Sequence, residues 1–176
     1  MMPLKTLRGV ITMDDNDGES FNNLIFNFES LNRKRAWRIK EAYLWPATAT
    51  TSVSADDQMM VQANLATDNI RANIDNVLNI SDTRLFGFLY SQYLLREDGS
   101  ADFLVPNGFG IRDSQFLLDP DTIVTNQLYL NARTDSDSVS SNLRKWSYLI
   151  VMESLSISPE ESILQQLKGI GQDISA

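Results

Sequence analysis

Most apolar residues of this 176-residue chain stand in short segments that alternate apolar and polar side chains. A period of two is typical of β-strands that bury one face. Turn signals such as Asp-Gly, Pro-Asn-Gly and Asp-Pro-Asp separate the segments. We therefore predict about eight strands, with candidates at residues 7–13, 21–28, 37–45, 59–65, 84–95, 101–105, 116–118, 122–133 and 145–157. Residues 47–55 are either a loop or an edge strand. Alternation within three of the strands predicts which side chains share a face: Leu24, Phe26 and Phe28 in the first, Trp37, Ile39, Tyr43 and Trp45 in the second, and Trp146, Tyr148, Ile150 and Met152 in the third.

Two segments have the period of a helix instead. Apolar residues from Ile70 to Leu78 recur at helical spacing, which predicts a short inserted helix over residues 69–78 with Asp68 as its N-cap. Near the C-terminus, Ser158 and Glu161 form a capping box ahead of a second apolar stripe. This pattern predicts a C-terminal helix over residues 159–176.

Strands dominate, and one internal helix cannot supply the crossovers that a doubly wound parallel sheet needs. We predict an all-β fold: an antiparallel, eight-stranded jelly-roll β-sandwich with the short inserted helix and the C-terminal helix. Residues 1–158 form the sandwich. Residues 159–176 form an amphipathic helix that either belongs to the same domain or contacts another subunit.

The chain contains no histidine and no cysteine. A disulfide, a thiolate or imidazole metal ligand, a cysteine nucleophile and a Ser-His-Asp triad are therefore excluded. The commonest general acid–base group is also absent. We predict that the protein is not an enzyme and has no catalytic residues, no cofactor and no metal site.

The net charge of −8 is unevenly distributed. Residues 1–45 hold seven basic and six acidic side chains, whereas residues 46–176 hold eight basic and seventeen acidic ones. Such an acidic chain binds polyanions poorly in general. Its apolar runs are far shorter than the ~20 residues of a membrane span, so we expect no contact with a membrane.

A local basic segment is the exception to this acidic balance. Five residues in it are the candidates for binding nucleic acid: Arg33, Lys34, Arg35, Arg38 and Lys40. They would pair with phosphates while Trp37 stacks on a base. The alternative interpretation is a basic turn that enters a strand, with Trp37 in the core.

Acidic clusters coincide with turn signals. The cluster at residues 14–19 does not match a calcium-binding EF-hand, because Gly18 at the sixth position puts Leu24 at the twelfth, where Glu is required. Two further pairs could bind a cation at a subunit contact: Asp119 with Asp121, and Asp135 with Asp137. Asp is also an ordinary turn residue, and we favour solvated turns.

The apolar stripe of the C-terminal helix must dock on something to be buried. It packs either on the chain's own sandwich or on a neighbouring subunit. For the second case, the candidate contact residues are Ile163, Leu164, Leu167 and Ile170.

The C-terminal third resembles a known family. It reads LDPDTIVTNQLYLNA at residues 118–132, then a Ser-rich stretch, then RKWSYLIVMESLSISPEESILQQLKGIGQDI at residues 144–174. This is similar to the last two strands of single-jelly-roll capsid proteins from small icosahedral viruses with circular single-stranded DNA genomes. The resemblance implies a coat protein of the virion. It would self-assemble into an icosahedral shell and have other copies of itself as its main partners.

In one respect the chain departs from that family. Such capsid proteins usually begin with a long Arg/Lys-rich arm that neutralises the genome, whereas residues 1–7 here contain a single lysine. Contact with genomic nucleic acid would therefore fall to the basic segment around Trp37.

A second class of function stays open. The chain could be a non-catalytic β-sandwich binding module for carbohydrate or a receptor, including a trimeric one. Aromatic side chains exposed on one face would support it, and the candidates are Tyr43, Trp45, Tyr90 and Tyr93. An enzyme that uses a pair of carboxylates is the third alternative.

Overall fold

The structure is a computed structural model that describes residues 4–13, 18–28, 34–47, 50–51, 57–70, 78–96, 102–106, 114–134, 145–164 and 167. Its strands are β1 (Leu4–Thr12), β2 (Glu19–Asn27), β3 (Arg35–Pro46), β4 (Thr50–Thr51), β5 (Asp57–Ala66), β6 (Leu85–Arg96), β7 (Asp102–Pro106), β8 (Leu117–Leu118), β9 (Gln127–Thr134) and β10 (Lys145–Ser156). Each predicted strand overlaps one of these, and β4 adds a short strand within residues 47–55.

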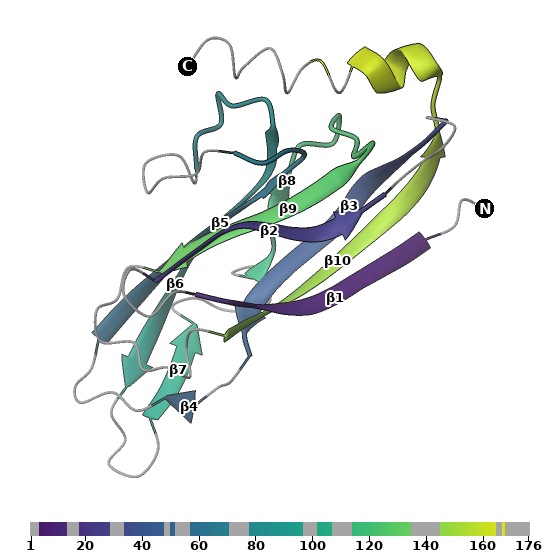
Figure 1. Cartoon of the computed structure of the whole chain (residues 1–176). Coiled ribbons are helices and arrows are strands. Elements are labelled where there is room, and N and C mark those ends of the chain that lie inside the picture. The colour runs from purple at the N-terminus through teal and green to yellow at the C-terminus, as the bar shows by residue number, and fades with distance from the viewer. Residues whose placement is uncertain are drawn as a thin grey trace.

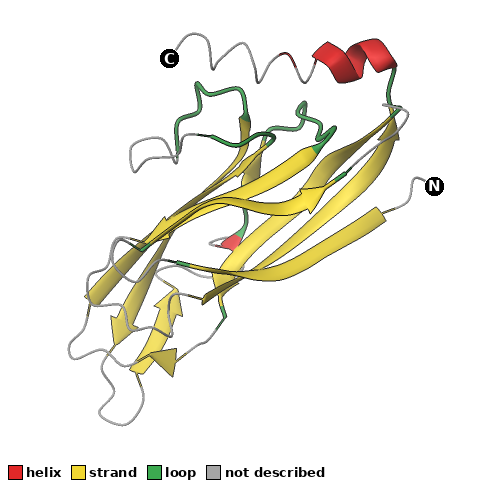
Figure 2. Ribbon diagram, in the orientation of Figure 1, coloured by secondary structure: helices red, strands yellow, loops and turns green. Residues whose placement is uncertain are grey.

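The strands form two antiparallel sheets packed as a β-sandwich (Figure 1). One sheet has three strands in the order β1-β10-β3. The other has seven, in the order β2-β9-β5-β6-β7-β4 with β8 paired to β6. Figure 2 shows how strands dominate the described chain. The predicted all-β antiparallel sandwich is therefore confirmed.

The main core lies between the sheets and is organised around β10. Trp146 of β10 is fully buried, and its ring meets Tyr93 of β6 edge-on with ring centroids 5.7 Å apart. Ile150 and Met152 follow at the same strand parity and are also buried. Leu149 has the opposite parity and is only half-buried. The alternation predicted for this strand is confirmed.

A β-bulge in β3 interrupts the regular alternation. Val151 of β10 pairs with Glu41, and the next residue, Met152, pairs with Ile39. Lys40 is therefore an extra residue on β3. An extra residue transfers every later side chain of a strand to the opposite face of the sheet.

The bulge corrects one prediction. Strict alternation placed Tyr43 and Trp45 on the same face as Ile39, and this is wrong. Ile39 faces the core, but beyond the bulge the core-facing residues are Ala42 and Leu44, both fully buried. Tyr43 and Trp45 lie on the outer face of the three-stranded sheet.

Strand β2 is also irregular. Its pairing with β9 shifts between Ser20 and Asn23 and again between Leu24 and Phe26. Asn22 has a φ of 55°, in the left-handed region. Leu24 is 47% exposed whereas Phe26 packs against the core. The prediction that Leu24 and Phe26 share a face is therefore wrong, because the second shift lies between them.

The inserted helix predicted over residues 69–78 is not found at its described ends. Residues 69, 70 and 78 are not helical, and residues 71–77 lie outside the described part of the chain. Ile70 is nevertheless buried, in a small cluster with Ala66, Leu85 and Tyr129.

The C-terminal helix begins where its capping signal predicts. Residues 159–164 and 167 are helical (Figure 2). The Ser158 hydroxyl oxygen accepts a hydrogen bond of 3.1 Å from the backbone N–H of Glu161, so the predicted N-cap is confirmed. Strand β10 ends at Ser156, only two residues before the helix.

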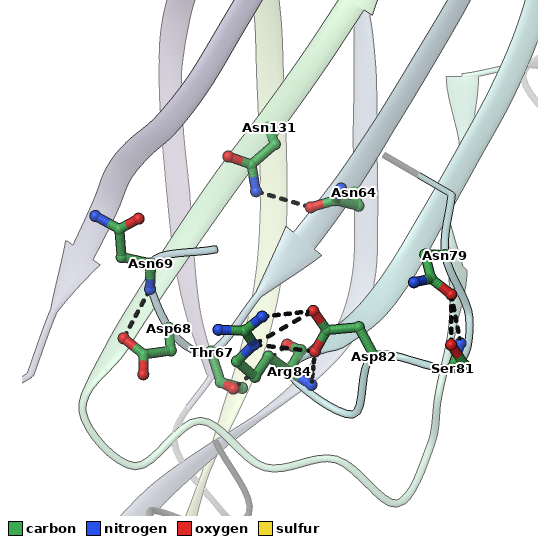
Figure 3. A network of polar contacts seen from close by, with 9 residues as sticks. All are labelled: Asn64, Thr67, Asp68, Asn69, Asn79, Ser81, Asp82, Arg84 and Asn131. Atoms are coloured by element: carbon green, nitrogen blue, oxygen red, sulfur yellow. Dashed lines mark hydrogen bonds and ion pairs between the residues drawn. The ribbon is translucent and has the colours of Figure 1, made fainter. Parts of the chain in front are cut away.

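A polar network links the end of β5 to the start of β6 (Figure 3). The Arg84 guanidinium donates to both carboxylate oxygens of Asp82, the shortest bond being 2.8 Å. The backbone N–H of Thr67 donates to the Arg84 carbonyl oxygen at 2.9 Å, which ties the two strand ends together. Nearby, the Asn131 amide donates to Asn64 at 2.8 Å, with both residues fully buried.

The ion pair shifts the titration of Asp82. Burial alone would raise the pKa of this carboxyl, but the hydrogen bonds and the positive charge of Arg84 hold the pKa below its usual range. A lowered pKa in the folded state means that stability is gained above the unfolded pKa of about 3.9. This stability is lost as the pH falls through the lowered pKa of the folded state.

We therefore expect Asp82→Asn to lower the free energy of unfolding by about 1.5–3 kcal/mol at pH 7, the range for hydrogen bonds to charged groups. The deficit should shrink as the pH falls below the usual range for aspartate. Urea unfolding from pH 7 down to pH 3 measures both effects. Asp121→Asn, at an exposed turn, makes the same change of charge as a control. Equal losses in the two variants would contradict a role for the ion pair.

Candidate functional site

The basic segment follows β3 along the three-stranded sheet. Lys34 and Arg35 are exposed at the start of the strand. Arg38 is half-buried, and Lys40 is exposed at the bulge. Arg33 lies outside the described residues. Three of the four described candidates therefore lie on β3 and Lys34 directly precedes it, but the four do not share one environment.

A carboxylate divides the basic segment into two parts. Glu153 of β10 pairs in register with Arg38, and its Oε2 lies 3.9 Å from Lys40 Nζ. A negative charge at this position repels an incoming phosphate and offsets the attraction of its two basic neighbours. Lys34 and Arg35 are therefore the stronger candidates for binding nucleic acid.

Trp37 belongs to an aromatic cluster and not to an open stacking surface. Its ring meets Phe26 and Phe28 of the facing region edge-on, with centroids 5.9 and 5.8 Å away. Lys5 Nζ stands 4.6 Å from the centre of the Phe26 ring and 5.8 Å from that of Trp37. Trp37 also packs against the main core. Of the two interpretations left open by the sequence, the structure favours the one with Trp37 in the core.

The acidic turns carry local hydrogen bonds where they are described. Asp119 accepts a bond from the backbone N–H of Asp121 at 3.1 Å and another from the Thr122 hydroxyl at 2.6 Å. Residues 14–17, Asp135 and Asp137 lie outside the described residues. Across the described ranges, no group of three or more acidic side chains is arranged to hold a metal ion.

The four aromatic residues proposed for a binding face lie in three different places. Tyr93 is 2% exposed and belongs to the core, so that candidate is wrong. Tyr90 is 51% exposed on β6 of the seven-stranded sheet. Tyr43 and Trp45 share the outer face of the three-stranded sheet, where Trp45 is 38% exposed.

Trp45 opens onto a surface groove with a volume of about 590 Å³. We call this the outer-face groove, and it is lined by Arg8, Gly9, Val10, Trp45, Ser147, Tyr148 and Leu149. Strand register explains how it forms: Val10, Ser147 and Trp45 make one cross-strand row, and Arg8 and Leu149 belong to the next. Val10 is 57% exposed. The groove is therefore an apolar strip with one cation on its β1 side.

Sequence reasoning missed most of this groove. The alternation of β1 was used to find core residues, and the outward-facing Arg8 and Val10 were given no role. The bulge at Lys40 then concealed the true direction of Trp45. The detectable signal was the apolar residue Val10 at a polar position of the alternating pattern.

The hydroxyl of Tyr43, beside the groove, already has a hydrogen-bond partner. This hydroxyl donates a hydrogen bond of 3.2 Å to Glu41. Burial, then this hydrogen bond and the negative charge of Glu41, raise the pKa of the Tyr43 phenol. The phenol therefore stays protonated at neutral pH and keeps Glu41 as its partner.

The C-terminal helix has its apolar side uncovered. The exposed fractions are 42% for Ile163, 62% for Leu164 and 53% for Leu167, and Ile170 lies outside the described residues. Ser162, the residue directly before Ile163, is buried. The three apolar side chains are therefore only partly covered by the described residues. They are available for a contact with another molecule.

No helix in the described part of the chain is both long enough and apolar enough to cross a membrane. In comparisons with known proteins, no family model matches the chain and no curated protein sequence matches it significantly. The resemblance to viral capsid proteins thus stays a proposal.

The division of the basic segment by Glu153 gives a test. We expect Lys34→Ala to reduce the slope of log affinity against log salt for single-stranded DNA by about 0.7, the value for one lost phosphate contact. Lys40→Ala removes the same charge from an exposed position beside Glu153 and should change the slope much less. Binding titrations at several salt concentrations measure both slopes. Equal slopes for the two variants and the native chain would contradict phosphate binding at Lys34.

Proposed function

We propose that this chain is a viral capsid protein that folds as a jelly roll and self-assembles into an icosahedral shell around its genome. The genome would be of the circular single-stranded DNA type, and the protein would reside in the virion. Its action would be assembly through complementary surfaces, without catalysis.

The observation that carries the proposal is the nested order of strand pairing. The first long strand, β1, pairs with the last, β10, and β2 pairs with β9. Further inward, β3 meets Gln115, just before β8, through a bridge at Tyr43, and β5 pairs with β6. A long antiparallel hairpin, in which the first half of the chain pairs with the second half and the whole ribbon then wraps into two sheets, has this nested pairing order. The order therefore supports a jelly roll.

A jelly roll alone does not define a function, because lectin domains and cupins use it as well as viral capsids. The surfaces add weight to the capsid proposal. The chain carries two separate apolar surfaces, the outer-face groove and the exposed side of the C-terminal helix. Exposed apolar patches of this kind mark protein interfaces.

The charge distribution is compatible with limited contact with the genome. Lys34 and Arg35 are exposed and lie away from the carboxylate that pairs with Lys40. The chain as a whole carries −8. Neutralisation of the genome would therefore rely on this short basic stretch, or on cations and other proteins inside the particle.

The size of the particles that the purified chain forms distinguishes a shell-forming capsid protein from a small binding module. We expect the purified chain at physiological salt to form closed shells of uniform diameter, with interfaces of obligate type that bury more than about 2,000 Å² in total. Light scattering and negative-stain microscopy measure the diameter and its spread. A monodisperse monomer, dimer or trimer at every concentration and salt would contradict the proposal.

One observation favours a second candidate, a carbohydrate-binding module. Trp45 is partly exposed in the outer-face groove, with Arg8 and Ser147 as hydrogen-bonding neighbours. Aromatic rings with nearby polar groups suit the apolar face and hydroxyls of a sugar. In that case a monomer or small oligomer should show a sugar-dependent shift that Trp45→Ala abolishes. Tyr90→Ala, an exposed aromatic of the other sheet, is the matched control.

A further inference from the structure

The chain has two partly exposed apolar surfaces, one on the C-terminal helix and one in the outer-face groove. The helical residues 159–164 and 167 present Ile163, Leu164 and Leu167 as a ridge, with exposed fractions of 42%, 62% and 53%. The outer-face groove is a hollow of about 590 Å³ whose apolar lining includes Val10, Trp45 and Leu149. A ridge of aliphatic side chains that fills such a hollow removes both from water, at roughly 25 cal/mol for each Å² buried.

The helix cannot reach the groove of its own chain. Leu149 stands nine residues before Ser158, and eight of the intervening positions are extended strand or its continuation, a span of roughly 30 Å. The continuous helix described at residues 159–164 is only about 9 Å long. Figure 1 shows it beyond the C-terminal end of β10, the end opposite the groove residues of that strand. A helix of this kind that fills the groove therefore comes from another molecule.

Charge complementarity favours a second copy. Two carboxylates, Glu160 and Glu161, are exposed in the first turn of the helix. On the groove side, Arg8 is exposed on β1, and Lys145 is exposed two residues before Ser147 on the same face. Each copy therefore offers an anionic, apolar ridge and a cationic, apolar hollow.

We propose that the helix that begins at residue 159 of one copy, with its described residues 159–164 and 167, docks in the outer-face groove of the next copy. Ile163, Leu164 and Leu167 cover Trp45 and its neighbours, while Glu160 and Glu161 face Arg8 and Lys145. This inference deepens the proposed assembly function and rests on it. Because ridge and hollow are different surfaces, the contact is heterologous and repeats from copy to copy, as in a closed ring or shell.

Site-directed cross-linking tests the contact directly, because the native chain has no cysteine. One variant carries Val10→Cys and a second carries Leu164→Cys, both at exposed positions. After mixing and mild oxidation, we expect a disulfide-linked heterodimer of twice the chain mass. The matched control replaces Val10→Cys with Ile80→Cys, a residue 81% exposed outside both surfaces. This control should give at least about tenfold less heterodimer.

Charge reversal supplies a second readout. Arg8→Glu with Lys145→Glu should raise the protein concentration needed for half-assembly by about tenfold or more, since like charges then face each other. Adding Glu160→Lys and Glu161→Lys restores the native net charge and should restore native assembly. A failure of this complementary swap to rescue assembly would overturn the charge pairing.

The possible outcomes distinguish the proposed helix–groove contact from the proposed capsid function. Cross-linked heterodimer without shells supports the docked helix and overturns the capsid function. Shells that form with no cross-link and no response to charge reversal overturn the contact and leave the capsid function standing. No association in any form overturns both. A sugar that binds at Trp45 without cross-linking would assign the groove to a small ligand and also overturn the contact.

Discussion

The pairing of β10 with both β1 and β3 is the constraint on which the rest of the molecule depends. Leu7 lies opposite Ile150, so the first and last strands close the three-stranded sheet together. The inner face of β10 supplies Trp146, which meets Tyr93 of the facing sheet. Contacts between residues this distant in sequence form slowly, and the sandwich cannot close until the C-terminal strand is available. The outer face of the same strand forms the floor of the groove, so core and surface share one scaffold.

Local patterns predicted the strands well because alternation and turn chemistry act over a few residues. They could not predict the side-chain faces beyond the bulge at Lys40, since a bulge is defined by its pairing partner, Met152 of β10, far away in sequence. The position of Glu153 between Arg38 and Lys40 was hidden for the same reason. The burial of Ile70 against Tyr129 could not be predicted from the apolar stripe either, because Tyr129 lies on β9, far away in sequence.

The functional surfaces follow from this geometry. Strand alternation sends half of each strand's side chains outward, and the bulge adds Trp45 to that outward set. Two apolar surfaces then remain on a chain with a net charge of −8, which would otherwise repel its own copies. In the proposed contact, the opposite charges at the helix and at the groove would counter that repulsion locally and would set a direction for association between identical subunits.

The three tryptophans of the chain occupy three distinct environments. Trp146 is sealed in the core, Trp37 stands edge-on to two phenylalanines at the margin of the core, and Trp45 is partly open to solvent. Indole emission shifts to shorter wavelength when the ring leaves water. Only the surface ring changes its surroundings when the groove is covered, while the other two hold their emission as long as the fold persists. Tryptophan fluorescence therefore distinguishes two events: covering the groove shifts the emission to shorter wavelength, whereas unfolding of the core shifts it to longer wavelength.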